Sequence, residues 1–151
     1  MKFLIQRVNY AKCMVDGSIT GEITHGLCVF IGIADSDTKT IADKMIQKLL
    51  GMRIFADSED KINLSIQDVS GSLLLISQFT LYANCKKGNR PSFTDAGKPE
   101  FANTMYEYII AECQKQIATV ETGIFGANMK IQLENDGPFT IMLDSNDLTI
   151  V

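Results

Sequence analysis

Apolar and polar positions alternate along the first part of the chain, which is the pattern of strands that bury one face. Residues 2–15 carry this alternation and predict a long strand. Asp16-Gly17 predicts a tight hairpin turn into a second strand, which runs to the break at His25-Gly26. Residues 27–33 are apolar almost throughout, so they predict a central strand.

Two later segments have the four-residue spacing of apolar side chains that is typical of amphipathic helices. The first follows possible N-caps in residues 35–38 and is stopped by Gly51. The second begins at Pro99, a favoured first helical residue, and runs to about Ala118. The apolar faces consist of Ile41, Met45 and Leu49 in the first helix, and of Phe101, Met105, Tyr108 and Ile109 in the second.

The remaining segments predict the rest of a sheet. They are a short strand at residues 52–55, a buried strand at 69–79, a long loop at 82–98, and two last strands at 127–133 and 139–143. Between these last strands, the residue types at 135–138 favour a hairpin turn. We therefore predict one domain over residues 1–151, of the mixed α/β class, in which two main helices pack on a mixed sheet.

Composition and charge narrow the class of protein. With 46% apolar and 21% charged residues, the chain has the composition of a globular protein. Its longest apolar stretches have strand length and Arg7 interrupts the start, so we expect a cytoplasmic protein without a membrane segment. The net charge of -4 disfavours clamping of long nucleic acids but leaves open the binding of one RNA end. The basic cluster at residues 86–90 is either a solvated loop or such a contact.

Side chains for metal or nucleophilic chemistry are sparse. The four cysteines lack paired spacing and His25 is the one histidine, so a zinc site is disfavoured and free buried thiols are expected. The sequence has no G-x-S-x-G, G-x-G-x-x-G or Walker pattern, which disfavours a serine triad and a phosphate-binding loop. We expect no metal and no cofactor, and we interpret His25 as an incidental turn residue.

Two polar islands adjoin apolar runs. Residues 77–81 follow the run at 73–76, and residues 135–140 precede the run at 141–143. Main-chain N–H groups around Phe79 and Thr80 could stabilise an oxyanion, a contribution of about 3 kcal/mol per donor. From the residues alone, the plainer interpretation is favoured, in which the first island caps a strand and the second forms a turn.

Taken together, the two islands resemble the signature motifs of the D-aminoacyl-tRNA deacylases of bacteria and eukaryotes. The similarity runs nearly end to end, through residues 4–8, 20–23, 53–55, 63–64, 77–81, 90–93, 122–123 with 125, and 135–138 with 140. The resemblance implies hydrolysis of the ester bond of D-aminoacyl-tRNA, and some action on glycyl-tRNA mischarged on tRNA(Ala). It also implies the fold of that family, a mixed, partly barrel-like sheet packed with two main helices.

The resemblance further implies a homodimer. In it Gly137-Pro138, joined by a cis bond, reaches into the partner's pocket, where main-chain carbonyls hold the substrate's amino group and an L side chain is excluded. Arg7 resembles the residue that holds this Gly-Pro step in position. Phe139 stands where the family more often has valine, which puts the detailed fit of the pocket rim in question, but not the reaction.

The resemblance also assigns roles to the remaining site residues. These are catalysis by Ser77, Gln78, Phe79 and Thr80, adenosine binding by Phe125 and Met129, and contacts with the tRNA acceptor end by Lys86, Lys87 and Arg90. A nucleophilic Thr80 comes second to catalysis by main-chain amides and water, because nothing in the sequence supplies it with a base. Two alternatives stay open: a nucleic-acid-associated binding protein that keeps the fold without the activity, and an editing domain for L-amino acids.

Overall fold

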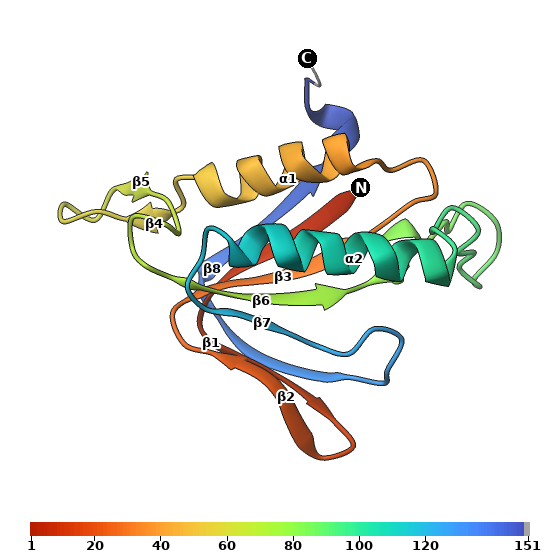
Figure 1. Cartoon of the computed structure of the whole chain (residues 1–151), viewed down its shortest axis with the longest axis horizontal. Coiled ribbons are helices and arrows are strands. Elements are labelled where there is room, and N and C mark those ends of the chain that lie inside the picture. The colour runs from red at the N-terminus through yellow and green to blue at the C-terminus, as the bar shows by residue number, and fades with distance from the viewer. Residues whose placement is uncertain (150–151) are drawn as a thin grey trace.

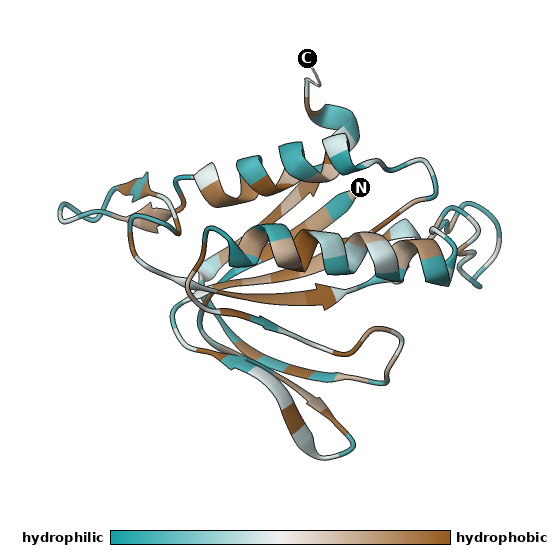
Figure 2. Ribbon diagram, viewed as in Figure 1, coloured by the Kyte–Doolittle hydropathy of each residue, from teal (hydrophilic) through white to brown (hydrophobic). Residues whose placement is uncertain are grey.

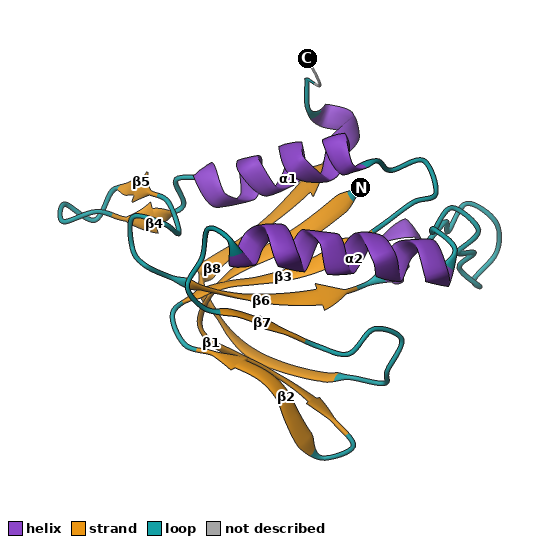
Figure 3. Ribbon diagram, in the orientation of Figure 1, coloured by secondary structure: helices purple, strands orange, loops and turns teal. Residues whose placement is uncertain are grey.

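In the computed structural model, which describes residues 1–149, a strongly curved mixed sheet carries two helices on one face (Figure 1). Figure 3 shows the same arrangement by secondary structure. The elements in chain order are β1 Lys2–Val15, β2 Ser18–Ile23, β3 Gly26–Gly32, α1 Lys39–Gly51, β4 Phe55–Ala56, β5 Ile62–Leu64, β6 Ser72–Ser77, the 3-10 helix η1 Phe79–Tyr82, α2 Pro99–Gln114, β7 Val120–Thr122, β8 Lys130–Asp144 and the 3-10 helix η2 Ser145–Asp147. The predicted fold class is confirmed.

The first three strands form as predicted. Val15 pairs with Ser18 across a two-residue turn in which Asp16 has φ 49° and Gly17 has φ 79°. Two positive φ angles match the turn whose twist suits a hairpin. β3 is the central strand, antiparallel to β1 on one side and parallel to β6 on the other, with α1 in the connection. Its near-continuous burial explains why it is apolar along its whole length.

The sheet buries apolar side chains on both faces. The larger core lies between the sheet and the two helices and includes Phe3, Val29, Leu49 and Ile109. The smaller core, which includes Cys13, Cys28 and Leu74, lies on the opposite face. Figure 2 shows β3 and β6 as mainly hydrophobic strands beneath the helices. Neither α1 nor α2, the longer helices of residues 1–149, has the apolar length that a membrane crossing requires.

The curled sheet is nearly closed on itself where β2 approaches β7. A Cβ built on Gly21 would lie 2.5 Å from the Thr122 carbonyl oxygen, closer than real Cβ atoms come. Thr20 Oγ1 lies 3.5 Å from the same oxygen, to which it donates a hydrogen bond. Glycine is therefore required at position 21 by close approach of two backbones, not by a turn. This contact accounts for the barrel-like form.

Several predicted boundaries were wrong. The buried strand predicted at 69–79 is β6 alone, because residues 65–71 form turns and Phe79 begins η1. The short strand predicted at 52–55 is displaced to β4. The second helix ends at Gln114 and not near Ala118, since the amides of Gln116 and Ile117 both donate to the Cys113 carbonyl and close a turn.

The face of the second helix was also assigned incompletely. Tyr106 lies in the core with Ala102 and Ile109, whereas Tyr108 is only half-buried and donates its hydroxyl to Asp43 Oδ1 at 2.7 Å. The spacing of three and four residues from Ala102 through Tyr106 to Ile109 defines the buried stripe.

The hairpin predicted at residues 135–138 is absent, and this is the main correction. Residues 130–144 form one strand, β8, which pairs with β1 on both sides of the polar island. Asn135 pairs with Val8 and Thr140 pairs with Gln6, so four residues of β8 bulge out opposite Arg7 alone. Asn, Asp, Gly and Pro suit a bulge as well as a turn, so residue types could not separate the two. The Gly137-Pro138 peptide bond in this bulge is cis.

Candidate active site

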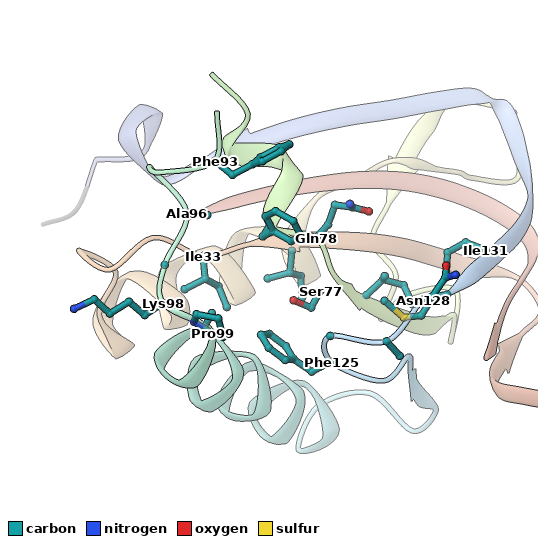
Figure 4. A pocket seen from close by; sticks show the side chains of 18 of the residues that line it. Ile33, Ser77, Gln78, Phe93, Ala96, Lys98, Pro99, Phe125, Asn128 and Ile131 are labelled. Atoms are coloured by element: carbon teal, nitrogen blue, oxygen red, sulfur yellow. The ribbon is translucent and has the colours of Figure 1, made fainter. Parts of the chain in front are cut away.

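A pocket of about 660 Å³ opens where β6 ends. Three segments form its walls: the end of β6 with the start of η1, residues 93–99 leading into α2, and residues 125–129 before β8. In Figure 4, Ser77 and Phe125 lie on opposite sides of the space, and the Lys98 side chain extends away from it. The walls are mainly apolar, so the few polar groups that face the space define its chemistry.

The main chain turns sharply at the first polar island. The Gln78 amide donates to the Ile31 carbonyl at 2.7 Å, and the Leu81 amide donates to the Gln78 carbonyl at 3.3 Å. Between them, the N–H groups of Phe79 and Thr80 have no acceptor in the described part of the chain. A helix start leaves such donors unpaired and oriented outward. The turn therefore supplies two unpaired N–H donors, and one of them belongs to Phe79, which lines the pocket. An oxyanion site requires such donors.

The side chains of this island play a different part. Ser77, Gln78 and Phe79 line the pocket, and Thr80, although next in sequence, is not part of its wall. Gln78 Nε2 donates to Thr80 Oγ1 at 2.5 Å. Neither residue contacts a histidine or carboxylate among residues 1–149 that would remove the threonine proton.

The wall opposite β6 is held by a buried tyrosine that sequence reasoning missed. Tyr106 donates its hydroxyl to the Leu75 carbonyl at 2.7 Å, and its ring lies 6.1 Å from that of Phe125. The Gly123 amide donates to the same carbonyl at 3.3 Å, which ties down the start of the loop that carries Phe125 and Met129. Burial raises the pKa of the Tyr106 phenol, so it stays a neutral donor. The sequence could have indicated that Tyr106 is buried, because its spacing from Ala102 and Ile109 places it on the apolar stripe of α2.

Gly137 and Pro138 lie outside this pocket, close to Arg7. Arg7 Nε lies 3.2 Å from the Asp136 carbonyl oxygen and 3.3 Å from its carboxylate, and Nη1 donates to the Ile54 carbonyl at 2.7 Å. Gly137 has φ 132°, and a Cβ there would lie 3.1 Å from Arg7 Nη2. The guanidinium thus fills the space beside the glycine, where a side chain would collide.

Further polar contacts fix the ends of the bulge. Asn135 accepts the Phe139 amide at 2.8 Å through Oδ1 and donates to Thr140 Oγ1 at 2.7 Å through Nδ2. Gln6 Nε2 donates to the same hydroxyl at 3.2 Å. The Phe139 ring lies 4.9 Å from Arg7 Cζ, a cation–π contact that valine could not make. Phe139 therefore packs on the Arg7 side of the bulge and is not part of the wall of this chain's pocket.

The basic cluster lies on the loop between η1 and α2, which Figure 3 shows beyond the N-terminal end of α2. Main-chain hydrogen bonds between Asn84 and Ser92 close its base, at 2.7 and 2.9 Å. Lys86, Lys87 and Arg90 are exposed, lie outside the pocket wall, and form no ion pair within residues 1–149.

Side chains capable of nucleophilic or metal chemistry are not gathered at the pocket. His25 is an exposed turn residue whose ring packs on Phe55 with 5.1 Å between centroids. Cys13, Cys28 and Cys113 are buried, and burial raises the pKa of Cys28 to about 12. Cys85 is exposed, so the prediction of buried thiols was wrong for that residue. No three His, Cys, Asp or Glu side chains of the described residues form a metal-ligand group.

The chain is similar in sequence to tRNA deacylases along nearly its whole length. The family described as "D-Tyr-tRNA(Tyr) deacylase" matches residues 4–144. A D-aminoacyl-tRNA deacylase of Fusobacterium nucleatum is 49% identical over 150 residues, covering 99% of each chain. One of Thermosipho melanesiensis is 47% identical over 146 residues, covering 96% of this chain and 97% of the relative.

Solved structures share the fold. The structure of a "c-Myc DNA Unwinding Element Binding Protein" superposes with a TM-score of 0.91 at 36% identity, covering 95% of this chain and 98% of that one. A "probable eukaryotic D-amino acid tRNA deacylase" superposes with a TM-score of 0.76 at 17% identity, over 94% of this chain and 97% of the other. At that identity the second likeness concerns the fold alone.

Proposed function

The chain belongs to the D-Tyr-tRNA(Tyr) deacylase family, and from this premise we propose how it selects D-aminoacyl-tRNA and cleaves it. Its reaction is hydrolysis of the ester that joins a D-amino acid to tRNA, which releases the free amino acid and the tRNA. Three features of the chain serve this reaction: stabilisation of the reacting carbonyl, rejection of L substrates, and binding of the terminal nucleoside.

Main-chain amides stabilise the transition state. The observation that carries this step is the pair of unpaired N–H groups of Phe79 and Thr80 beside the pocket. Water attacks the ester carbonyl, and the oxygen that becomes negative accepts hydrogen bonds from these two donors, worth about 3 kcal/mol each. The bond between the acyl carbon and the ribose oxygen then breaks. The neighbouring ribose hydroxyl passes the proton lost by the water to this ribose oxygen. An aminoacyl ester is activated enough to need no strong side-chain base.

A second copy of the chain supplies chiral selection. Each chain presents Gly137-Pro138 in a bulge that is fixed by Arg7 but lies outside its own pocket. In the proposed homodimer this bulge enters the partner's pocket, where its carbonyls accept hydrogen bonds from the substrate's amino group. With the amino and carbonyl groups both fixed, an L side chain is directed into protein and a D side chain to solvent. Glycine has no side chain to exclude, so the same geometry admits glycyl-tRNA.

The terminal adenosine occupies the apolar end of the pocket. Phe125 and Met129 line this wall. The loop that carries them is held at its start by the hydrogen bond from the Gly123 amide to the Leu75 carbonyl. Lys86, Lys87 and Arg90 lie on a loop near the pocket and contact the acceptor end, a footprint small enough for an acidic protein. We propose a cytoplasmic location, because the substrate belongs to translation.

The test compares rates on D-tyrosyl-tRNA and L-tyrosyl-tRNA at equal concentration. We expect a preference for the D substrate of at least about 100-fold, since burying a misplaced side chain costs several kcal/mol. Equal rates would contradict the chiral step. Sedimentation equilibrium tests the dimer separately, and an active monomer at assay concentration would rule out a site shared between copies.

One alternative has an observation of its own. The structural relative at 36% identity is described as a DNA unwinding element binding protein. A DNA-binding function predicts tight, salt-sensitive binding of duplex DNA by this chain without ester cleavage. The net charge of -4 and the unpaired amides at the pocket both favour the deacylase reaction instead.

A further inference from the structure

We infer that two phenylalanines at the mouth of the pocket, Phe79 and Phe93, form a stacking site for the base of the nucleotide that precedes the terminal adenosine. The adjoining basic loop contacts the phosphate of that nucleotide. The inference rests on the proposed function, and it extends the substrate site from one nucleoside to two nucleotides.

Of this aromatic pair, Phe79 is exposed to solvent in the single chain and Phe93 is half-buried. The Phe79 and Phe93 rings meet edge to face, with centroids 5.1 Å apart and an interplanar angle of 73°. Both residues line the pocket, and Phe79 is 56% exposed. An edge-to-face pair covers only one face of one ring, so ring faces remain free to take a third aromatic group. Unpaired bases at single-stranded ends are commonly bound in this way, by stacking on aromatic side chains.

The size of the pocket indicates which base reaches the pair. A volume of about 660 Å³ is that of a site for one small ligand, here the terminal adenosine with its amino acid. With the nucleoside against Phe125 and the ester near the Phe79 amide, the rest of the RNA must leave through the mouth. The preceding nucleotide is therefore the first part of the RNA that meets Phe93.

The charges beside the pair suit a phosphate. Phe93 directly follows the main-chain bridge between Asn84 and Ser92 that closes the basic loop. Lys87 and Arg90 on this loop have no acidic partner among the described residues, although the chain as a whole carries a net charge of -4. A local excess of unpaired cations next to open aromatic rings matches a nucleotide, which offers both a phosphate and a π face.

The experiment uses two substrates that differ only beyond the terminal nucleoside: D-tyrosyl-tRNA and D-tyrosyl-adenosine. Phe93→Leu keeps an apolar side chain but removes the ring, and it leaves the catalytic amides in place. We expect kcat/KM on D-tyrosyl-tRNA to fall about tenfold through KM, which is the loss expected for one stacked base. On D-tyrosyl-adenosine we expect a change of less than about twofold, because that substrate has no preceding base.

Two variants serve as controls. Phe93→Tyr retains an aromatic face, so kcat/KM on D-tyrosyl-tRNA should fall much less than in Phe93→Leu. Phe101→Leu removes another half-buried phenylalanine, which lies on α2 outside this pocket, and should leave the ratio between the two substrates unchanged. A Lys87→Gln/Arg90→Gln variant tests the phosphate contact. It should reduce the slope of log(kcat/KM) against log salt by about 0.7 per lost phosphate contact, on tRNA alone.

The outcomes separate the inference from the proposed function. If Phe93→Leu loses activity equally on both substrates, the residue only shapes the pocket and the stacking site is wrong. If it loses activity on neither, no base stacks on Phe93 and the inference is wrong. A wild-type enzyme that cleaves neither substrate would instead contradict the deacylase function itself.

Discussion

The two polar islands of this chain expose main-chain groups of opposite kind. At residues 77–80 the backbone turns into η1 and leaves two N–H donors unpaired beside a pocket. At residues 136–139 the backbone leaves the β1–β8 ladder as a bulge. Pro138 has no N–H and the Phe139 amide donates to Asn135, so carbonyl oxygens outnumber free N–H groups in the bulge. In the proposed function, the first island stabilises developing negative charge and the second binds an ammonium group. The site depends on main-chain geometry more than on reactive side chains.

The islands also differ in how they are held. The first is fixed by main-chain hydrogen bonds from Gln78 and Leu81. The second is fixed by the side chains of Arg7 and Asn135. Substitution of a side chain should therefore disturb the bulge far more than the oxyanion turn, and substitutions that change the backbone should have the largest effect.

Gly137→Ala tests the bulge most severely. An added Cβ would lie 3.1 Å from Arg7 Nη2 and from the Phe139 amide nitrogen, at a φ of 132° that side chains rarely adopt. We expect a loss of kcat/KM on D-tyrosyl-tRNA of more than about 100-fold, because the strained φ and the tight contacts together displace the bulge, and a positioned site tolerates little displacement. The control is Gly17→Ala, which has the same kind of positive φ but no atom within 4 Å of the new Cβ. Retention of activity within tenfold of wild type would show that the bulge does not select the substrate.

Arg7→Lys removes the main support of the bulge and keeps its charge. The Arg7 side chain is 11% exposed, and its guanidinium reaches Asp136 and the Ile54 carbonyl together, which an ammonium cannot do. We expect kcat/KM to fall about 10- to 30-fold, equivalent to losing one hydrogen bond to a charged group. Arg53→Lys is the matched control, since Arg53 makes one exposed hydrogen bond to Asn63. Equal rates for the two variants would mean that the bulge holds its form without Arg7.

The sequence predicted the features that are set locally. The Asp16-Gly17 hairpin, the central strand and both helices follow from turn residues, caps and apolar spacing within one segment. The position of the first island at a strand end was predicted in the same way, although Phe79 proved to start a 3-10 helix.

Features that depend on distant partners could not be predicted from residue types. Residues 135–138 have turn chemistry, but they form a bulge because β1 is long enough to pair with β8 on both sides of them. Gly21 is needed because β7 lies close to β2. The hydrogen bond between Thr20 and Thr122 joins residues that are 102 positions apart in the sequence. Tyr106 supports the pocket through a carbonyl on another strand. In each case the deciding contact joins segments that no local pattern relates.

Tyr106→Phe tests the support of the adenosine wall. Loss of the hydroxyl leaves the Leu75 carbonyl with the weaker 3.3 Å bond from Gly123 and loosens the loop that carries Phe125. We expect KM for D-tyrosyl-tRNA to rise about fivefold with kcat within twofold, since one neutral hydrogen bond is worth about 1 kcal/mol. Tyr108→Phe is the control, because it removes a hydroxyl from the same helix, bonded to Asp43 and away from the pocket. Similar KM changes in both variants would show that the effect is one of helix stability.

Thr80→Ala should have the smallest effect and separates the two kinds of support directly. The variant removes Oγ1 and the hydrogen bond from Gln78 Nε2, but it leaves the Thr80 amide in place. Because that amide is fixed by main-chain bonds on either side of it, we expect kcat to change by less than about threefold. A covalent threonine would require the hydroxyl, and its loss would reduce kcat by several orders of magnitude. A single-turnover assay on D-tyrosyl-tRNA distinguishes these results, and a large loss would move the chemistry from the main chain of η1 to its side chain.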